Sequence, residues 1–306
     1  MKTIIKKIKK LGLRLGIKKL IGYEAIFSCA FCERVKGAEL YKKVIPQNKI
    51  FHYLPHSDKY WYADPLVCEK DGKEVVFLEC VNRKTGIGCI ACSDISDGKW
   101  EEPIPIIEES FHMSFPMCFT WHEKLYMIPE TEMSESINLY HCIEFPYKWE
   151  KIGTYLQGLR LVDSVILTQT DEAIKFLASE YNPADDFFTR FHCYEMFFNK
   201  NEIQMHDLGR VTEHFTLNSR AAGPIIHAEE NLLPLQRSTS GIYGYSVQFN
   251  TFSCNIPGKI TTEILPHDIH IKGKKLIGVH TYSQSTHYEV LDIQYLVFNK
   301  NKWRER

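Results

Sequence analysis

Residues 162–180 read VDSVILTQTDEAIKFLASE, a pattern that recurs along the chain. Two short apolar segments stand on either side of the polar tripeptide 170–172. Short apolar runs separated by a tight polar turn are typical of β-hairpins. The stretch therefore predicts one strand at Val162–Gln169 and a second, antiparallel strand at Ala173–Glu180.

The same hairpin unit occurs five times. The other copies pair Ala63–Glu69 with Glu74–Cys80, Ser114–Trp121 with Leu125–Glu130, Ala221–Ala228 with Leu232–Arg237, and His267–Ile271 with Lys275–Thr281. The copies start about 50 residues apart, and further strands are expected after the hairpins, for example at Ile137–Ile143 and Tyr288–Phe298. Such a period, with about four strands per repeat, indicates a β-propeller blade. We therefore predict an all-β, five-bladed β-propeller over residues 51–306. The alternative is a β-sandwich in which the spacing is accidental.

The propeller geometry predicts where a site would form. In each blade the first strand lines the central channel, and the second strand runs antiparallel to it, so the start of the first strand and the end of the second meet at one rim. The starts of the first strands are Asp64, Ser114, Asp163, Arg220 and Asp268. The ends of the second strands are Glu79, Glu130, Glu180, Gln236 with Arg237, and His280. So many ionisable groups at one channel mouth are costly unless they are used, although some of them could be ordinary salt bridges of the rim.

The first 23 residues differ from the rest of the chain. They hold eight Lys or Arg and no acidic residue, whereas the whole chain has a formal net charge of −1. Ile4, Ile8, Leu11 and Leu15 fall at helical spacing, so the segment predicts a short basic amphipathic helix. Such a helix binds an anionic membrane surface. The alternatives are a solubilising leader or a helix packed on the body, and residues 24–50 are expected to connect the segment to the propeller.

Composition and motifs limit the classes of partner and cofactor that we expect. The net charge near zero argues against nucleic acid as the main partner. Two Cys-x-x-Cys pairs occur, but the pair Cys89 and Cys92 lies in an alternating stretch, which places its sulfurs on opposite faces of a strand and is poor geometry for one metal. The sequence also has no Gly-rich phosphate loop and no Ser nucleophile elbow. We therefore expect no metal and no cofactor.

Two sets of residues carry a resemblance to known families. The segment Trp61–Pro65, WYADP, resembles the first-blade motif of the five-bladed clan of arabinanases, β-xylosidases, invertases and levansucrases. An ordered series over roughly residues 50–300 resembles the N-terminal domain of plant glucosamine inositolphosphorylceramide transferase and its stand-alone bacterial relatives. The series comprises Ser114-Phe115-Pro116, Tyr126–Thr131, Leu139-Tyr140, Phe145-Pro146 with Trp149, Asp163, Arg220–Gly223, Gln236-Arg237, Tyr243-Gly244 and His280-Thr281.

The resemblance implies a five-bladed propeller and carboxylate-driven sugar chemistry. In the hydrolase clan the Asp-Pro of the first blade supplies the base or nucleophile, which here is Asp64. The clan's second-blade Arg-Asp-Pro is absent, and Ser114-Phe115-Pro116 stands in its place, which argues against simple sucrose-type hydrolysis. In the plant protein the recognised glycosyltransferase domain follows the propeller.

Glycosyl cleavage or transfer needs one carboxylate as base or nucleophile and one carboxylic acid to protonate the leaving oxygen. We assign the first role to Asp64 and the second to Glu130, with Asp163 orienting sugar hydroxyls or tuning Glu130. The expected substrate-binding residues are Glu79, Ser114, Arg220, Gln236, Arg237 and His280. Of these, the planar fork of Arg220 suits an anionic group such as a phosphate or a uronate. Trp61, Tyr62, Phe115 and Tyr243 are candidates either for stacking on sugars or for the core.

Three functions fit these observations. The first is an enzyme of glycosyl transfer in cell-surface polysaccharide or glycolipid assembly, cytoplasmic and held at the inner face of the membrane by residues 1–23. Its expected partner is a sugar or glycan, with a sugar nucleotide or a lipid-linked glycan as the candidate donor. The second is a non-catalytic glycan-binding propeller, and the third is a glycoside hydrolase.

The basic segment leads to a testable expectation. We expect residues 1–23 to bind the protein to anionic vesicles, and salt to weaken this binding because it screens the eight positive charges. Cosedimentation at low and at high salt measures the effect, with vesicles of neutral lipid as the control. Equal sedimentation of the chain with and without this segment would refute the expectation.

Overall fold

The computed structural model describes residues 23–46, 49–182, 187–199, 202–211, 220–239, 242–253 and 256–298. The basic helix predicted for the first 23 residues lies outside the described residues, apart from Tyr23, which begins a strand. Among the described residues no helix has the length and apolar character needed to cross a membrane.

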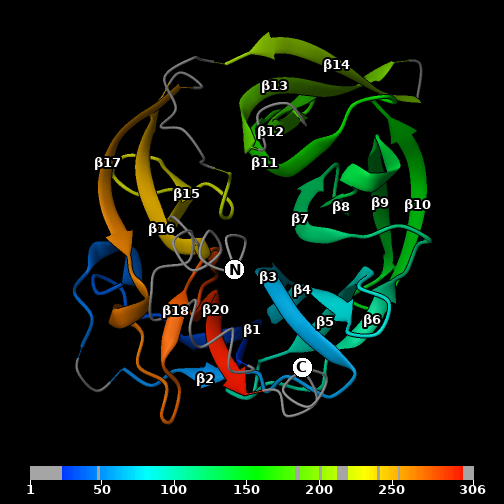
Figure 1. The fold of residues 1–306 in the computed structure, drawn as a ribbon. Helices are drawn as coiled ribbons and strands as arrows, with labels where there is room; N and C mark the ends of the chain where they lie inside the picture. Colours follow the sequence, from blue (N-terminus) through cyan, green and yellow to red (C-terminus); the bar gives the residue numbers. More distant parts are fainter. Residues whose placement is uncertain are drawn as a thin grey trace, which may run out of the picture.

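Five β-sheets are arranged around a central axis, as Figure 1 shows, and this confirms the predicted five-bladed propeller. Blade 1 consists of β3 (Tyr60–Lys70), β4 (Lys73–Asn82), β5 (Gly88–Asp94) and β6 (Ile104–Ile107). Blade 2 consists of β7 (Ser114–Trp121), β8 (Lys124–Glu130), β9 (Ile137–Glu144) and β10 (Lys148–Tyr155). Blade 3 consists of β11 (Leu161–Gln169), β12 (Ala173–Asn182), β13 (Phe187–Asn199) and β14 (Glu202–Arg210). The hairpins predicted for these three blades are therefore confirmed.

Blade 4 has a broken inner strand. Its sheet consists of β15 (Leu232–Thr239), β16 (Ile242–Ser253) and β17 (Ile256–Ile264). The strand predicted at Ala221–Ala228 is wrong as a regular element, because only two isolated bridges join this segment to β15. The segment also bonds to the next blade, since the Tyr282 N–H donates to the Ala222 carbonyl oxygen at 2.7 Å, and the backbones are so close that a side chain on Gly223 would lie 1.9 Å from the carbonyl oxygen of Tyr282.

Blade 5 is built from both ends of the chain. β18 (Leu276–Gly278) and β19 (Tyr282–Gln284) pair with β20 (Tyr288–Phe298), which in turn pairs with β1 (Tyr23–Glu33), and β2 (His52–Tyr53) follows. The hairpin predicted at His267–Ile271 and Lys275–Thr281 is therefore wrong, and the 3-10 helix η3 (Pro266–Asp268) begins that region. Residues 24–50, the expected connection between the basic segment and the propeller, contain most of β1 and the 3-10 helix η1 (Leu40–Lys42). A further 3-10 helix, η2 (Glu132–Ser134), follows β8 in blade 2.

Apolar side chains fill the spaces between neighbouring blades. Blades 1 and 2 enclose a cluster that includes Phe77 and Met127, and blades 5 and 1 enclose another that includes Phe31 and Leu78. Cys92 belongs to the first of these clusters, whereas Cys89 packs against the second. The two thiols thus lie on opposite faces of β5, as the alternation in the sequence predicts.

A buried ion pair links the chain between Leu40 and Lys49 to blade 5. The Glu289 carboxylate on β20 is completely buried and accepts hydrogen bonds from Lys49 Nζ at 2.6 Å, the Leu40 backbone N–H at 2.6 Å and the Tyr282 hydroxyl at 2.7 Å. A buried carboxylate is stable only while its partners satisfy it. Glu289 therefore ties the chain after β1 to the blade that β1 completes.

We expect Lys49→Met to lower the free energy of unfolding by about 3–5 kcal/mol, because it leaves Glu289 charged and buried without a cation. The double variant Lys49→Met with Glu289→Gln is the matched control and should recover part of the loss, since it removes the stranded charge. Urea unfolding of the three proteins measures the difference. A single variant as stable as the parent would contradict this account of the ion pair.

Candidate functional site

The same irregularity occurs in the inner strands of blades 1, 2 and 3. In each of them two residues stand opposite one residue of the next strand, which is a β-bulge. The first bulge residue is Asp64, Phe115 and Asp163 in turn, with φ of 47°, 44° and 53°. Residues other than Gly rarely adopt positive φ, and such strain clusters at functional sites. The bulges are therefore a built-in feature that sets two carboxylates at equivalent places in two blades.

Arg220 joins the carboxylates of blades 2 and 3. Its Nε lies 2.5 Å from Asp163 Oδ2, and its second terminal nitrogen lies 2.8 Å from Asp163 Oδ1 and 2.5 Å from Glu130 Oε2. All three side chains are largely buried. The guanidinium fork is thus matched by two carboxylates in this structure.

His280 joins the carboxylates of blades 1 and 5. It lies between β18 and β19, where its Nε2 is 3.3 Å from Asp64 Oδ1 and its Nδ1 contacts the carboxylate of Asp292. Asp292, on β20, is completely buried and also accepts the backbone N–H groups of His280 at 2.8 Å and Thr281 at 3.0 Å. The imidazole therefore stands between two carboxylates, with a different nitrogen toward each.

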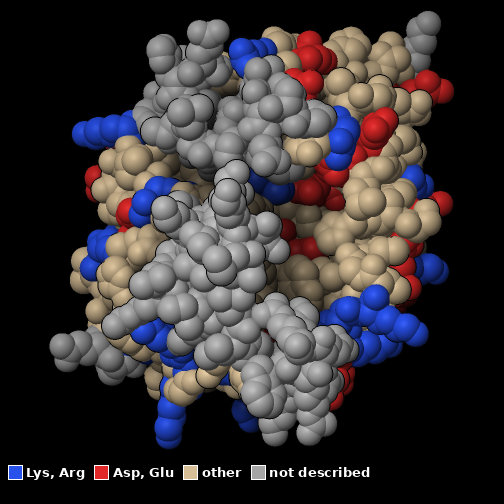
Figure 2. Space-filling view, in the orientation of Figure 1, with Lys and Arg blue, Asp and Glu red and all other residues tan. Residues whose placement is uncertain are grey.

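Tyr243 connects these two halves into one cluster. Its hydroxyl lies 3.1 Å from a terminal nitrogen of Arg220, and its ring lies 5.5 Å from the His280 ring, centroid to centroid, in an edge-on arrangement. The Tyr243 side chain is 46% exposed, so it forms the solvent-facing wall of an otherwise buried cluster. Figure 2 shows acidic side chains gathered around a hollow near the middle of the face in view.

Burial and crowding shift the ionisation of the cluster. Burial raises the pKa of Asp64 to about 8, with the charge of His280 opposing the rise and nearby carboxylates, Glu79 first among them, adding to it. Burial likewise raises the pKa of Glu130 well above its usual range, and Asp163 adds to the rise while Arg220 opposes it. Carboxyls that keep a proton near neutral pH can act as acids, and perturbed groups in a cleft mark candidate functional sites.

The other predicted residues support the cluster from its edges. Glu79 pairs with Ala63 in the ladder beside Asp64, and its carboxylate lies 2.8 Å from His112 Nε2. Ser114 is buried opposite Glu130 in the β7–β8 ladder. Gln236 is buried, and its backbone N–H donates to the Arg220 carbonyl oxygen at 2.8 Å. The last two residues thus position the backbones that carry the carboxylate and the guanidinium.

Three residues of the predicted rings lie apart from the cluster. Arg237 pairs with Glu263 at 2.6 Å on the far side of β15, since neighbouring strand residues face opposite ways. Asp268 caps η3 through the Leu265 N–H and pairs with Lys43. Glu180 lies 3.5 Å from His192 Nε2. None of these contacts involves Arg220 or His280.

Sequence reasoning missed Asp292 and the packing of Phe27 on His280. A signal for the first was present, because Asp292 is one of two acidic residues, with Glu289, inside the otherwise mostly apolar strand β20. The Phe27 ring, from β1, lies 4.7 Å from the His280 ring. Of the aromatics considered for sugar stacking, Tyr62 and Phe115 are buried in the core, and Tyr243 is exposed at the cluster.

Asp64, His280 and Asp292 are also the group of described residues whose ligand atoms, within 4.8 Å of one another, could in principle surround a cation. The imidazole argues against this use. Its two nitrogens point to different carboxylates, so one ion contacting both carboxylates would require the ring to turn away. The arrangement instead suits a chain of proton-sharing contacts.

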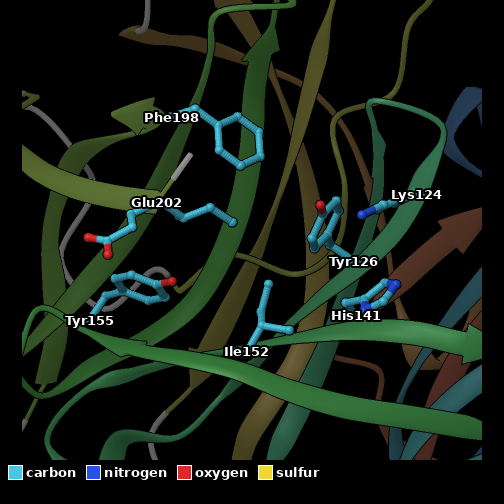
Figure 3. Close-up of a pocket in the computed structure, with 8 residues that line it drawn as sticks. Lys124, Tyr126, His141, Ile152, Tyr155, Phe198 and Glu202 are labelled. Carbon is cyan, nitrogen blue, oxygen red and sulfur yellow. The ribbon is translucent and has the colours of Figure 1, made fainter. Parts of the chain in front are cut away.

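A separate groove of about 490 Å³ lies between blades 2 and 3 (Figure 3). It is lined by Lys124, Tyr126, His141, Ile152, Tyr155, Phe198, Glu202 and Ile203. Lys124 begins β8 at the turn of the β7–β8 hairpin, whereas Ser114 and Glu130 pair at the opposite end. The groove is therefore not part of the carboxylate cluster.

The chain was compared with known families and curated proteins. The family model described as "Glucosamine inositolphosphorylceramide transferase 1, N-terminal" matches residues 55–299. The chain is 34% identical over 107 residues to glucosamine inositolphosphorylceramide transferase 1 of Arabidopsis thaliana, which is 34% of this chain and 14% of that protein. It is 29% identical over 123 residues to the Oryza sativa subsp. indica protein of the same name, 39% of this chain and 16% of that one. The match thus spans a small part of these curated relatives.

Solved structures show the same fold at low sequence identity. The catalytic domain of a GH62 α-L-arabinofuranosidase from Coprinopsis cinerea has a TM-score of 0.52 at 10% identity, covering 77% of this chain and 90% of that chain. An exo-1,5-α-L-arabinanase from a bovine ruminal metagenomic library has a TM-score of 0.50 at 14% identity, covering 81% and 97%. At these identities the likeness concerns the fold alone.

Arg220 and Arg237, both predicted at the site, can be compared in one experiment. We expect Arg220→Gln to lower the free energy of unfolding by about 3–5 kcal/mol, because Asp163 and Glu130 would lose their shared cation while buried. Arg237→Gln should cost less than about 1 kcal/mol, because that side chain is 38% exposed. Denaturant unfolding at neutral and at acidic pH measures both, and the Arg220 loss should shrink in acid, where the carboxyls take up protons. Equal losses for the two variants would argue against the buried cluster.

Proposed function

This chain belongs to the family of glucosamine inositolphosphorylceramide transferase 1 N-terminal domains, and from this premise we propose that it acts on a glycan as an enzyme of glycosyl transfer. The curated relatives are called glucosamine inositolphosphorylceramide transferase 1, a name that contains a sugar, a ceramide lipid and a transfer reaction. The proposed role is therefore in the assembly of a cell-surface polysaccharide or glycolipid. The sugar substrate is bound at the carboxylate cluster of Asp64, Glu130 and Asp163.

One observation carries this proposal: three blades place these carboxyl groups in one buried cluster at the channel, two of them on strained bulges. Such a cluster costs stability, because each burial penalises the charged form and the groups repel one another. A protein that serves only as a scaffold gains nothing from that cost. Glycosyl chemistry does, since it needs one group to donate a proton and another to accept one.

The surroundings of the three carboxyl groups suggest a different role for each in the proposed reaction. Glu130 keeps its proton because burial and Asp163 raise its pKa, and this suits the acid that protonates the leaving oxygen. Asp64 is the base or nucleophile in its carboxylate form, which the charge of His280 favours and which prevails above its pKa of about 8. Asp163 holds Arg220 at two points, and the same guanidinium also contacts Glu130. Tyr243, half exposed beside both halves of the cluster, offers an aromatic edge and a hydroxyl to a sugar.

The proposal also includes the sugar donor and the location of the protein in the cell. A sugar nucleotide or a lipid-linked glycan supplies the sugar, and residues 1–23 hold the protein at the inner, cytoplasmic face of the membrane. The basic composition of that segment supports this placement. The membrane surface would bring the enzyme close to a lipid-linked acceptor.

A non-catalytic glycan-binding propeller is the second candidate, and one contact favours it. Arg220 already pairs with both Asp163 and Glu130, so two of the three carboxylates are engaged without a substrate. In a binding site such pairing would preorganise the acceptor oxygens for sugar hydroxyls. The two functions differ in one respect that can be measured, namely whether a product forms.

A panel of sugar nucleotides and lipid-linked sugars, offered with glycolipid acceptors and analysed by mass spectrometry, tests the proposal. We expect one product, and we expect Asp64→Asn and Glu130→Gln each to reduce its formation about 100-fold or more. Asp207→Asn is the matched control, because Asp207 pairs with His192 outside the cluster. Saccharide binding by calorimetry without any product would favour the binding propeller. Full activity of both cluster variants would overturn the assigned roles.

A further inference from the structure

Asp292 is surrounded by hydrogen-bond donors. Its Oδ1 accepts the N–H groups of His280 and Thr281, and its Oδ2 lies 3.4 Å from the N–H of Asp64 and in contact with His280 Nδ1. Both oxygens therefore act as acceptors. His280 Nδ1 contacts Asp292 Oδ2 closely, although the two atoms are not aligned as a regular hydrogen bond. Because imidazole is more basic than a carboxylate and both Asp292 oxygens are acceptors, this contact favours the form of His280 with a proton on Nδ1.

This assignment leaves Nε2 as the nitrogen that changes state. Nε2 lies 3.3 Å from Asp64 Oδ1, so a neutral His280 directs a lone pair at Asp64 and a charged His280 directs an N–H at it. The ring cannot easily swing out of this line. Phe27 covers one side at 4.7 Å, Tyr243 stands edge-on at 5.5 Å, and the ring is almost entirely buried.

We propose that Asp292 and His280 form a proton relay for Asp64, in which Asp292 is a positioning residue that fixes the tautomer of His280, and His280 exchanges a proton with the Asp64 carboxyl. This inference deepens the proposed function, on which it rests for its chemistry. It changes the assignment of His280 from a binder of sugar hydroxyls to a carrier of protons.

In the proposed transfer, the proton of the acceptor moves in two stages. Asp64 takes a proton from the hydroxyl of the acceptor, so an acceptor O–H bond breaks and a carboxyl O–H bond forms. The acceptor oxygen bonds to the sugar carbon as the bond from that carbon to the leaving oxygen breaks, and Glu130 gives its proton to the leaving oxygen. The carboxyl O–H bond then breaks as Nε2 of His280, which is neutral above its pKa of about 9, takes the proton. Asp64 returns to the carboxylate form, and the new imidazolium stays paired with Asp292. Release of the proton to water restores neutral His280.

The charges around the ring favour this use. Burial alone would lower the pKa of His280, but Asp292 and Asp64 outweigh it and raise the pKa to about 9, with Arg220 opposing. Tyr243 faces the ring as well, and Glu79 and Asp163 act on Asp64. Asp64, with its pKa raised to about 8, and His280 thus titrate close together, and a proton passes between groups of similar pKa with little loss of free energy.

Nitrogen NMR of the full chain labelled with ¹⁵N-histidine tests the relay without any substrate. The His280 signals are identified by their absence from His280→Gln. We expect Nδ1 to be protonated throughout the titration and Nε2 to titrate above the ordinary histidine value of about 6.5. Asp292→Asn should lower the pKa of His280 by roughly one unit or more and disturb the Nδ1 proton. Asp64→Asn should lower the pKa but leave Nδ1 protonated.

Asp207→Asn is the control, since it removes a carboxylate from beside His192 and should leave His280 unchanged. An unprotonated Nδ1 in the parent protein, or the same His280 titration in Asp292→Asn, overturns the relay. If Asp292→Asn does not fold, the parent and Asp64→Asn spectra still decide between these outcomes. A relay seen by NMR together with no product from any sugar donor would refute the proposed function and leave the proton assignment standing.

Discussion

The ladder between β1 and β20 closes the ring, and the cluster depends on it. Eleven residue pairs, from Tyr23 opposite Phe298 to Glu33 opposite Tyr288, join the two ends of the described chain into one sheet. Blades rest on one another through apolar clusters, so a gap at blade 5 would free its neighbours on both sides. The same ladder carries Asp292 on one strand and Phe27 on the other. Closure of the fold and orientation of His280 are thus achieved by the same pair of strands.

Sequence patterns predicted the parts of the fold that are local. A hairpin brings together residues that are near in the chain, so its apolar runs and turn are visible in one short window, as for Ser114–Trp121, where the observed strand has the predicted bounds. Blade 5 is different, because its third strand comes from the other end of the chain. No repeat counted forward from blade 1 could include β1. The broken inner segment of blade 4 likewise depends on a contact between Gly223 and another blade.

The candidate site also has a part that the sequence predicts and a part that it does not. Asp64, Glu130 and Asp163 stand at hairpin ends, and topology alone predicted that they share a rim. The difference between Arg220 and Arg237 was not predictable from position along the strand, because it depends on the face each residue takes and on the carboxylates that meet it there. Asp292 escaped notice because its partners, His280 and the bulge at Asp64, become neighbours only when blade 5 meets blade 1.

The repeated bulge has a consequence for how such a protein can change over time. Three blades hold the same left-handed backbone at the same level, yet the residue there is Asp in blade 1, Phe in blade 2 and Asp in blade 3. The backbone geometry therefore does not depend on which side chain occupies it, and Phe115 is accommodated as core without altering the hairpin. Each of these three blades therefore offers a position where different side chains can stand on the same backbone. Evolution can add or delete a reactive group one blade at a time while the architecture around it is inherited unchanged.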